Sequence, residues 1–422
     1  MSNKPSIYEN LKQSGLIYQG TNLDTIQDLL DNHRVTFYLG IDPTADSLHI
    51  GHLCMLMVFK KLQDAGHQGI LLFGGATGMV GDPSGKQDMR QFLAKNSIIN
   101  NIESIKASAC KFVKMDGENP AIISNNAYWF DGLDFITFMR EIGAHFNVNK
   151  MLSADAYSNR LENGGLTFLE MSYMLMQSYD FVQLNKLHNC TLQIGGSDQW
   201  GNIVAGTNLH RKLKFGNDEH NDKKDMLQNI YGLTCPLLLT KDGKKMGKTE
   251  KGTLWLDANK TAPYDFYQYF YNVDDADVGT LLRWFSNFDN GTIDEMITKD
   301  IVSAKKTMAY ELTALVHGKE TAETCVQTSI NLFSKNAVDE NAPTETAPLS
   351  TLKSGINISQ LCVISKVAPS TSKARQLIES GAIFINNNKI TDITHTVTAV
   401  DLNENYILVK KGKKTFVKVV FE

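Results

Sequence analysis

Three short apolar stretches, each with glycine at or near its C-terminal end, constrain the fold of this chain more than any other feature. Residues 35–41 read VTFYLGI, residues 69–75 read GILLFGG and residues 192–196 read LQIGG. Their β-branched and aromatic residues predict strands. The stretch GHLCMLMVFKKLQDAG, between the first two, predicts a helix that ends at Gly66. Strands that alternate with helices predict a doubly wound α/β fold with a parallel sheet, in which ligands bind beyond the carboxyl ends of the strands.

The predicted helix begins within the sequence LHIGHL, residues 48–53, which contains His49 and His52. A metal site would need further ligands, and Cys54 alone does not complete one. Two satisfied structural histidines are the other simple interpretation. Free N–H groups at the start of a helix attract phosphate, imidazole N–H groups add donors, and Gly51 lets a ligand approach the backbone closely. The position of the pair therefore favours contact with a phosphate or a nucleotide.

A second candidate phosphate site is the sequence KMGKT, residues 245–249, in which glycine-rich turns flank Lys245 and Lys248. Lysine is a compact point charge that suits phosphate, although lysine-rich turns are usually only solvated.

The sequence GDPSGK at residues 81–86 is similar to part of a P-loop. A P-loop would also need glycine at residue 80 and serine or threonine at residue 87. The chain has Val80 and Gln87 there, which argues against a P-loop NTPase.

Composition changes along the second half of the chain. From about residue 261 the pattern is helical, and residues 334–350, SKNAVDENAPTETAPLS, have the prolines and few large apolar groups of a linker. From Lys353 to Glu422 there are ten basic and five acidic residues, a formal charge of +5 that leaves −9 for the rest of the chain. A basic module on an acidic body suggests a polyanionic partner. From charge alone, a solvated lysine-rich surface is an equal alternative.

Cysteine usage and the N-terminal sequence indicate the cellular compartment. The six cysteines are scattered without a CxxC pair, so the sequence predicts neither a zinc site nor a disulfide framework. The N-terminal sequence has no apolar signal region, and no uninterrupted apolar run is long enough to cross a bilayer. We expect a soluble, cytoplasmic protein without a membrane partner.

The two candidate phosphate sites together resemble the HIGH and KMSKS-type motifs of class I aminoacyl-tRNA synthetases. Gly247 and Thr249 replace two serines of that consensus, but both lysines remain. Longer stretches resemble the bacterial tyrosyl-tRNA synthetases: YLGIDPTADSLHIGHL (38–53), GGATGMVGDPSGK (74–86), LQIGGSDQWGN (192–202) and KKMGKTEKGTLWLD (244–257). The stretch SKARQLIESGAIFINNNKI (372–390) resembles a small RNA-binding fold. The resemblance covers almost the whole chain.

The resemblance implies a domain order and a set of partners. It implies a Rossmann-like catalytic domain over residues 1–230, a KMSKS-type loop and α-helical tRNA-binding domain over 231–335, a linker over 336–352 and a small α+β RNA-binding domain over 353–422. It further implies a homodimeric tyrosine–tRNA ligase that binds tyrosine, ATP and tRNA(Tyr). Mg²⁺ is expected to accompany ATP, without a protein-bound metal or prosthetic group.

A polar stripe on the helix predicted within residues 166–184 is the candidate amino-acid pocket. Tyr173, Gln177 and Asp180 are four and three residues apart, so they share one face of an otherwise largely apolar helix. A core helix with a few satisfied polar groups is the alternative from spacing alone. The resemblance implies that Asp180 and Tyr38 bind a phenol, and that Tyr173, Gln177 and Asp82 bind an ammonium group.

The resemblance also implies the residues that contact ATP. The phosphates are expected to contact Thr44, His49, His52, Lys245 and Lys248, with Lys86 and Arg90 closing over pyrophosphate. The ribose and the activated substrate are expected to contact Gly40, Asp42, Gly51, Asp198 and Gln199.

Three other functions compete with this interpretation. A nucleotidyltransferase with an HxGH motif would not explain KMGKT, the polar stripe or the basic tail. A non-catalytic RNA-binding protein would not need both histidines and both lysines. The tryptophanyl enzyme is closer, but Asp180 and the C-terminal module favour tyrosine.

Overall fold

The computed structural model of the chain describes residues 6–84, 93–162, 165–215, 229–249, 252–333, 343–353, 355–386, 388–403, 405–412 and 415–422. Contacts divide the chain into two compact units. The first comprises Met1–Thr261 with Val273–Met308, and the second comprises Ala262–Asn272 with Ala309–Glu422. Within the ranges that the structure describes, every helix is too short or too polar to cross a membrane.

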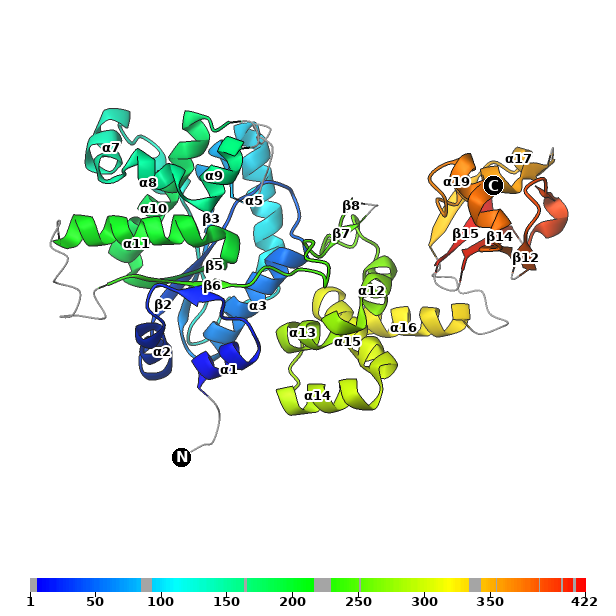
Figure 1. The fold of residues 1–422 in the computed structure, drawn as a ribbon, viewed down its shortest axis with the longest axis horizontal. Coiled ribbons are helices and arrows are strands. Elements are labelled where there is room, and N and C mark those ends of the chain that lie inside the picture. The colour runs from blue at the N-terminus through cyan, green and yellow to red at the C-terminus, as the bar shows by residue number, and fades with distance from the viewer. Residues whose placement is uncertain are drawn as a thin grey trace. The chain divides into compact units, whose positions relative to one another are not determined.

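A six-stranded sheet forms the centre of the first unit (Figure 1). Its spatial order is β1–β6–β5–β2–β3–β4, and all neighbouring strands are parallel except β1 and β6. The bounds are β1 (Gln19–Gly20), β2 (Thr36–Ile41), β3 (Gln68–Phe73), β4 (Ile122–Asn125), β5 (Cys190–Gly196) and β6 (Tyr231–Cys235). The prediction of a doubly wound parallel sheet is confirmed.

Helices cover both faces of this sheet. Helices α10 and α11 pack against β5, and α3 packs against β3 and β5 from the other side (Figure 1). The helices are α1 (Ile7–Gln13), α2 (Leu23–Asn32), α3 (Ile50–Asp64), α4 (Thr77–Val80), α5 (Lys95–Ala109), α6 (Ala127–Phe130), α7 (Phe135–Glu141), α8 (Val148–Leu152), α9 (Asp155–Glu162), α10 (Phe168–His188) and α11 (Trp200–Phe215), with 3₁₀ turns at Gly143–His145 and Ser197–Gln199. The helix predicted from GHLCMLMVFKKLQDAG is α3.

The strand order creates a crevice at one edge of the sheet. From β2 the chain continues outward to β3 and β4, and it later returns to β5 and β6 on the other side of β2. Such a reversal opens a binding crevice at the carboxyl ends of the strands on either side of it. Strands β2, β3 and β5 end at Ile41, Phe73 and Gly196, where three turns begin. These turns therefore meet at one edge, as the sequence predicts.

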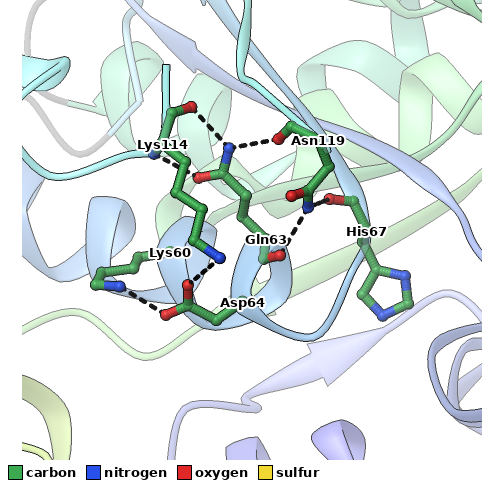
Figure 2. Close-up of polar contacts among 6 residues, drawn as sticks. All are labelled: Lys60, Gln63, Asp64, His67, Lys114 and Asn119. Atoms are coloured by element: carbon green, nitrogen blue, oxygen red, sulfur yellow. Dashed lines mark hydrogen bonds and ion pairs between the residues drawn. The ribbon is translucent and has the colours of Figure 1, made fainter. Parts of the chain in front are cut away.

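A polar cluster fastens the loop before β4 to the end of α3 (Figure 2). The buried Gln63 amide donates to the carbonyls of Lys114 and Asn119, both at 2.9 Å, and accepts from the Lys114 N–H at 2.8 Å. The Asn119 amide donates to the carbonyls of Gln63 and His67 at 2.7 and 3.0 Å. Two side chains thus bind backbone groups of the loop and of the turn after α3.

Replacing Gln63 with leucine should destabilise the protein by about 2–4 kcal/mol, because it removes the acceptor of the Lys114 N–H and the side-chain donor to the Lys114 and Asn119 carbonyls, of which the Lys114 carbonyl keeps the Ala121 N–H. The Lys60–Asp64 ion pair in the same cluster is half-exposed, so Lys60→Ala should cost less than about 1 kcal/mol. Chemical denaturation of the two variants measures the difference. Equal losses would show that the Gln63 hydrogen bonds do not hold the loop.

A helical segment follows the sheet, as the sequence pattern predicts. It comprises α12 (Pro263–Tyr271), α13 (Asp275–Phe285), α14 (Asn290–Lys299), α15 (Ile301–His317) and α16 (Lys319–Phe333). The division into units passes through α15, because Met308 belongs to the first unit and Ala309 to the second. The domain boundaries at residues 230 and 335 remain predictions.

The C-terminal module contains a five-stranded sheet of spatial order β12–β11–β14–β15–β9. Its apolar core includes Ile383, Val409 and Val419, all fully buried. The elements are β9 (Thr344–Ala347), α17 (Ser350–Lys353), β10 (Ile356–Asn357), α18 (Ile358–Ile364), α19 (Thr371–Glu379), β11 (Ile383–Ile385), β12 (Asn388–Ile390), β13 (Thr396–Val397), β14 (Tyr406–Lys411) and β15 (Thr415–Phe421), with a 3₁₀ turn at Ala399–Asp401.

The predicted linker, residues 336–352, is wrong at its C-terminal end. Strand β9 lies inside that range and pairs in parallel with β15, with Thr344 opposite Lys418 and Ala347 opposite Phe421. The sequence TETA has little apolar character, so it resembles a linker although backbone hydrogen bonds hold it in the sheet. The module therefore begins by Thr344.

Candidate active site

A cavity of about 450 Å³ lies at the carboxyl ends of β2, β3 and β5. Among its lining residues are the predicted site residues Tyr38, Gly40, Asp42, Thr44, His49, Gly51, His52, Asp82, Tyr173, Gln177, Asp180, Asp198, Gln199 and Lys245. The predicted residues Lys86 and Arg90 lie outside the described residues. The backbone of Lys248 forms part of the short strand β7 (Lys248–Thr249), but its side chain also lies outside the description.

The two histidines of LHIGHL form the cap of helix α3. His49 is the N-cap residue, and its Nδ1 accepts from the Gly51 N–H at 3.1 Å. Nδ1 of His52 accepts from the His49 N–H at 3.2 Å, and the two rings stack with centroids 3.9 Å apart. The spacing of three residues is therefore that of a reciprocal capping box.

This cap fixes which ring nitrogen carries the proton. A neutral imidazole that accepts at Nδ1 must carry its hydrogen on Nε2. Burial, followed by the neighbouring His49, lowers the pKa of His52 well below its ordinary value. His52 is therefore neutral at physiological pH, and both rings line the cavity with Nδ1 of each bound to a backbone N–H.

The KMGKT loop is attached to the HIGH helix, although about 190 residues separate them in sequence. Gly247 has φ +84°, and a Cβ atom there would lie 2.5 Å from the Ile50 side chain. Strand β7 pairs with β8 (Gly252–Thr253), after which Trp255 forms a β-bridge with His49. The glycine that replaces a consensus serine is thus explained by its backbone conformation and by its close approach to Ile50.

Lys245 is held by a carboxylate at the edge of the cavity. Its Nζ lies 3.2 Å from Oδ2 of Asp198, which follows β5. A phosphate that binds Lys245 would compete with this ion pair. The predicted phosphate and ribose residues are therefore neighbours in the structure.

The opposite part of the cavity contains a buried carboxylate. Asp180 on α10 is 3% exposed and accepts from Trp129 Nε1 at 2.8 Å and from Asn126 Nδ2 at 3.1 Å. Burial raises the pKa of Asp180 to about 8, and the hydrogen bonds from Asn126 and Trp129 oppose that rise. Tyr38, on β2, is also buried, and its hydroxyl has no hydrogen-bond partner among the described residues. A ligand hydroxyl between Tyr38 and Asp180 would satisfy both groups.

Helix α10, which carries the polar stripe, is fixed at its N-terminus. Thr167 and Glu170 form a capping box, and the Arg160 guanidinium donates to Glu170 Oε1 at 3.0 Å. Arg160 and Glu170 are both buried. This anchoring sets the rotation of the helix, and with it the direction in which Gln177 and Asp180 face.

The residues predicted to bind an ammonium group line the same cavity. The Tyr173 hydroxyl donates to Asp42 Oδ2 at 2.9 Å, and Asp82 Oδ2 accepts from Gln199 Nε2 at 2.6 Å. Gln177 Oε1 is buried and has no hydrogen-bond partner in the part of the chain that the structure describes. Two carboxylates and an unpaired amide oxygen accept hydrogen bonds, so this part of the cavity suits a cationic donor.

Asn126, Trp129 and Thr77 contact the predicted residues but were not predicted from the sequence. Asn126 and Trp129 follow β4, and Thr77 Oγ1 donates to Asp42 Oδ1 at 2.8 Å. The only sequence signal for them is their position after a buried strand. Among the described residues, no three His, Cys, Asp or Glu side chains come together as a metal site would require.

The fold and the site together define a class I aminoacyl-tRNA synthetase: a doubly wound sheet with a HIGH helix and a KMSKS-type loop joined at its carboxyl edge. The family described as tRNA synthetases class I (W and Y) matches residues 30–334. A second family, the tyrosine–tRNA ligase SYY-like C-terminal domain, matches residues 339–419. The chain is therefore an enzyme of this class with an additional C-terminal module.

Full-length relatives identify the family more narrowly. A tyrosine–tRNA ligase from Acetivibrio thermocellus is 45% identical over 417 residues, which is 98% of this chain and 99% of that protein. One from Clostridium kluyveri is 44% identical over 99% of this chain and 100% of that protein. A C-terminally truncated mitochondrial tyrosyl-tRNA synthetase from Aspergillus nidulans has a TM-score of 0.68 and 29% identity, and the match covers 78% of this chain and 95% of that one. The chain belongs to the tyrosine–tRNA ligase family.

Proposed function

We propose that this chain joins tyrosine to ATP, giving tyrosyl-adenylate and pyrophosphate, and then transfers the tyrosyl group to the 3′-terminal ribose of tRNA(Tyr). The observation that carries the proposal is the contrast between two parts of one cavity. Tyr38 and Asp180 are buried hydrogen-bonding groups that suit a phenol. His49 and His52 present neutral N–H donors that suit a phosphate.

The reaction needs no nucleophile from the protein. The tyrosine carboxylate attacks the α-phosphorus of ATP, and pyrophosphate leaves on the opposite side. The protein contributes by holding the reactants in line and by donating hydrogen bonds to the charge that develops on phosphorus and pyrophosphate. Because His52 is neutral and its donor is fixed by the cap, it needs no proton transfer to act in this way.

Each predicted residue has a role in this proposal. Tyr38 and Asp180 bind the phenol, while Tyr173, Gln177 and Asp82 bind the ammonium group. Gly40, Asp42, Gly51, Asp198 and Gln199 line the ribose and the activated substrate. The phosphate contacts are Thr44, His49, His52, Lys86, Arg90, Lys245 and Lys248. Mg²⁺ enters with ATP on its phosphates, since protein-only cages for Mg²⁺ are uncommon.

The proposal includes a cytoplasmic homodimer. Tyr128, Phe135 and Ile136, on α6 and α7, are 78%, 62% and 61% exposed. Large apolar side chains this exposed support burial against a second copy of the chain. Size-exclusion chromatography with light scattering tests the assembly state.

Pyrophosphate exchange tests the activity directly. The purified chain is incubated with ATP, Mg²⁺ and labelled pyrophosphate, together with each amino acid in turn. Exchange that depends on tyrosine is expected, with little for tryptophan or phenylalanine. Exchange that depends on a different amino acid, or none at all, would overturn the proposed function.

The basic C-terminal module should be needed for tRNA charging but not for tyrosine activation. A chain truncated after Ala342 retains every residue proposed to contact ATP and tyrosine and loses the +5 module. We expect exchange to be kept and charging of tRNA(Tyr) to fall by about tenfold or more, because phosphate contacts supply much of the affinity for nucleic acid. Equal charging by the two chains at physiological salt would remove the module from tRNA binding.

A further inference from the structure

A continuous set of hydrogen bonds joins two of the carboxylates that line the cavity, those of Asp180 and Asp42. Asn126 Nδ2 donates to Asp180 Oδ2 at 3.1 Å and to Thr77 Oγ1 at 2.9 Å. Thr77 Oγ1 donates to Asp42 Oδ1 at 2.8 Å, and Tyr173 donates to the other oxygen of Asp42 at 2.9 Å. Asp180 belongs to the proposed phenol site and Asp42 to the proposed ribose site. Thr77 and Asn126 lie between them and are fully buried.

The direction of each hydrogen bond in this set is fixed. The backbone N–H of Ala76 donates to Asn126 Oδ1 at 2.7 Å, which identifies the amide oxygen. Both hydrogens of Asn126 Nδ2 are then committed, one to Asp180 and one to Thr77. Since the Thr77 hydroxyl accepts from Asn126, its single hydrogen goes to Asp42. The donors therefore run from Asn126 toward a carboxylate at each end.

The glycines before Thr77 are required by the same contacts. A Cβ atom at Gly74 would lie 2.0 Å from Asp42 Oδ1 and 2.4 Å from Thr77 Oγ1. A Cβ atom at Gly75 would lie 2.2 Å from Asn126 Oδ1. Neither distance is possible for a real side chain, so the segment GGAT is built to let the carboxylate, the hydroxyl and the amide meet.

We infer that Thr77 is a positioning residue that couples the phenol site to the ribose site. The inference rests on the proposed function, which assigns Asp180 to the substrate phenol and Asp42 to ATP. Without the Thr77 hydroxyl, Asp42 loses a donor and one Asn126 N–H is left buried without an acceptor. Asn126 can then move to find another acceptor, and its hydrogen bond to Asp180 weakens. A change at one residue that contacts neither substrate's reacting atoms thus reaches both ends of the cavity.

Thr77→Val and Thr77→Ser separate this role from a packing role. Valine keeps the shape of threonine and removes the hydroxyl, whereas serine keeps the hydroxyl and removes a methyl group. For Thr77→Val we expect the tyrosine-to-phenylalanine ratio of kcat/KM to fall about tenfold and the KM for ATP to rise by a similar factor. Thr77→Ser should stay within about threefold of the wild type in both quantities.

A second variant, counted only if thermal unfolding shows that it folds, disturbs the same contacts without removing the Thr77 hydroxyl. Gly74→Ala keeps the hydroxyl but places a methyl group between Asp42 and Thr77, so it should change the same two quantities. Gly201→Ala, whose methyl group would meet its nearest side-chain atom at an ordinary 3.5 Å, is the matched control and should change neither.

The experiment is tyrosine- and phenylalanine-dependent pyrophosphate exchange at varied ATP, with thermal unfolding of each variant in parallel. If wild-type protein shows no tyrosine-dependent exchange, the proposed function fails. If wild-type protein is active, the inference is overturned in either of two ways. Folded Thr77→Val or Gly74→Ala could keep both the specificity ratio and the ATP KM, or Thr77→Ser could lose as much as Thr77→Val.

Discussion

Replacing His49 with alanine is expected to lower the rate constant of adenylate formation by about 10²–10³-fold, as loss of one preorganised donor to a transition-state charge does. Nδ1 of His49 is committed to the Gly51 N–H, so Nε2–H is its only donor to a phosphate. The effect should fall on kcat rather than on the KM for ATP, because the charge on phosphorus grows only in the transition state. Single-turnover measurement of adenylate formation tests this expectation.

The cap must be separated from the chemistry in this experiment. His49→Ala also removes the N-cap of α3, which should cost about 1 kcal/mol of stability. Serine is a good N-cap residue but is too short to replace the imidazole donor. His49→Ser should therefore have the stability of the wild type and a lowered rate constant of adenylate formation. A His49→Ser variant as active as the wild type would assign His49 to the cap alone.

Replacing Asp180 with asparagine is expected to reduce the preference for tyrosine over phenylalanine by about 10–100-fold. The tyrosine hydroxyl donates a hydrogen bond to the buried carboxylate, and phenylalanine offers no donor. A buried group without its hydrogen bond costs about 1–3 kcal/mol, or more if it is charged. Asparagine has nearly the same shape but no charge, so that cost shrinks. The measurement is the ratio of exchange efficiencies for the two amino acids. If both fall equally, Asp180 is a structural residue of α10.

The pH dependence of this preference follows from the raised pKa of Asp180, which burial places at about 8. Tyrosine donates to the ionised carboxylate, and phenylalanine binds better when the carboxyl is protonated. The preference should therefore grow as the pH rises through about 8. In Trp129→Phe a hydrogen bond to the ionised form of Asp180 is lost, so the pKa of Asp180 should rise. The increase in the preference for tyrosine should then occur at a higher pH than in the wild type. A preference that is flat from about pH 6 to pH 9 would contradict this assignment.

The contribution of Asp180 to the free energy of unfolding should change with pH in the opposite direction: it should fall as the pH rises. Its pKa in the folded protein lies above the ordinary value of an aspartate, so the folded state binds the proton more tightly than the unfolded state. This group therefore favours folding less and less as the pH rises from about 4 to about 8. In Asp180→Asn, which has no carboxyl group to titrate, this decrease of the free energy of unfolding with pH should be absent.

The strands and turns were predictable because their signals are local. VTFYLGI and GILLFGG are rich in residues that suit a buried sheet, each has glycine at or near its end, and a turn follows each. The gathering of these turns follows from parallel strand geometry. The family resemblance then implied which residues contact the substrates. The side chains of these residues that the structure describes line one cavity.

The remaining features depend on contacts between distant residues. Asn126 lies 54 residues from Asp180 and 49 from Thr77, and no periodicity along the chain marks such a pair. The histidine cap was missed for a different reason, because histidine is not among the usual N-cap residues. Strand β9 was missed because backbone pairing, rather than its side chains, holds TETA in the sheet.

The parallel pair β9–β15 has a mechanical consequence. Any pull transmitted along the chain into the C-terminal module enters at the start of β9 and acts along the strand axis. The contacts from Thr344–Lys418 to Ala347–Phe421 lie across that axis, so they are loaded together in shear and do not open one after another. The segment nearest the rest of the chain in sequence, a strand with little apolar character, is thus placed to resist extension, and a single-molecule pull from its N-terminal side should show one abrupt rupture.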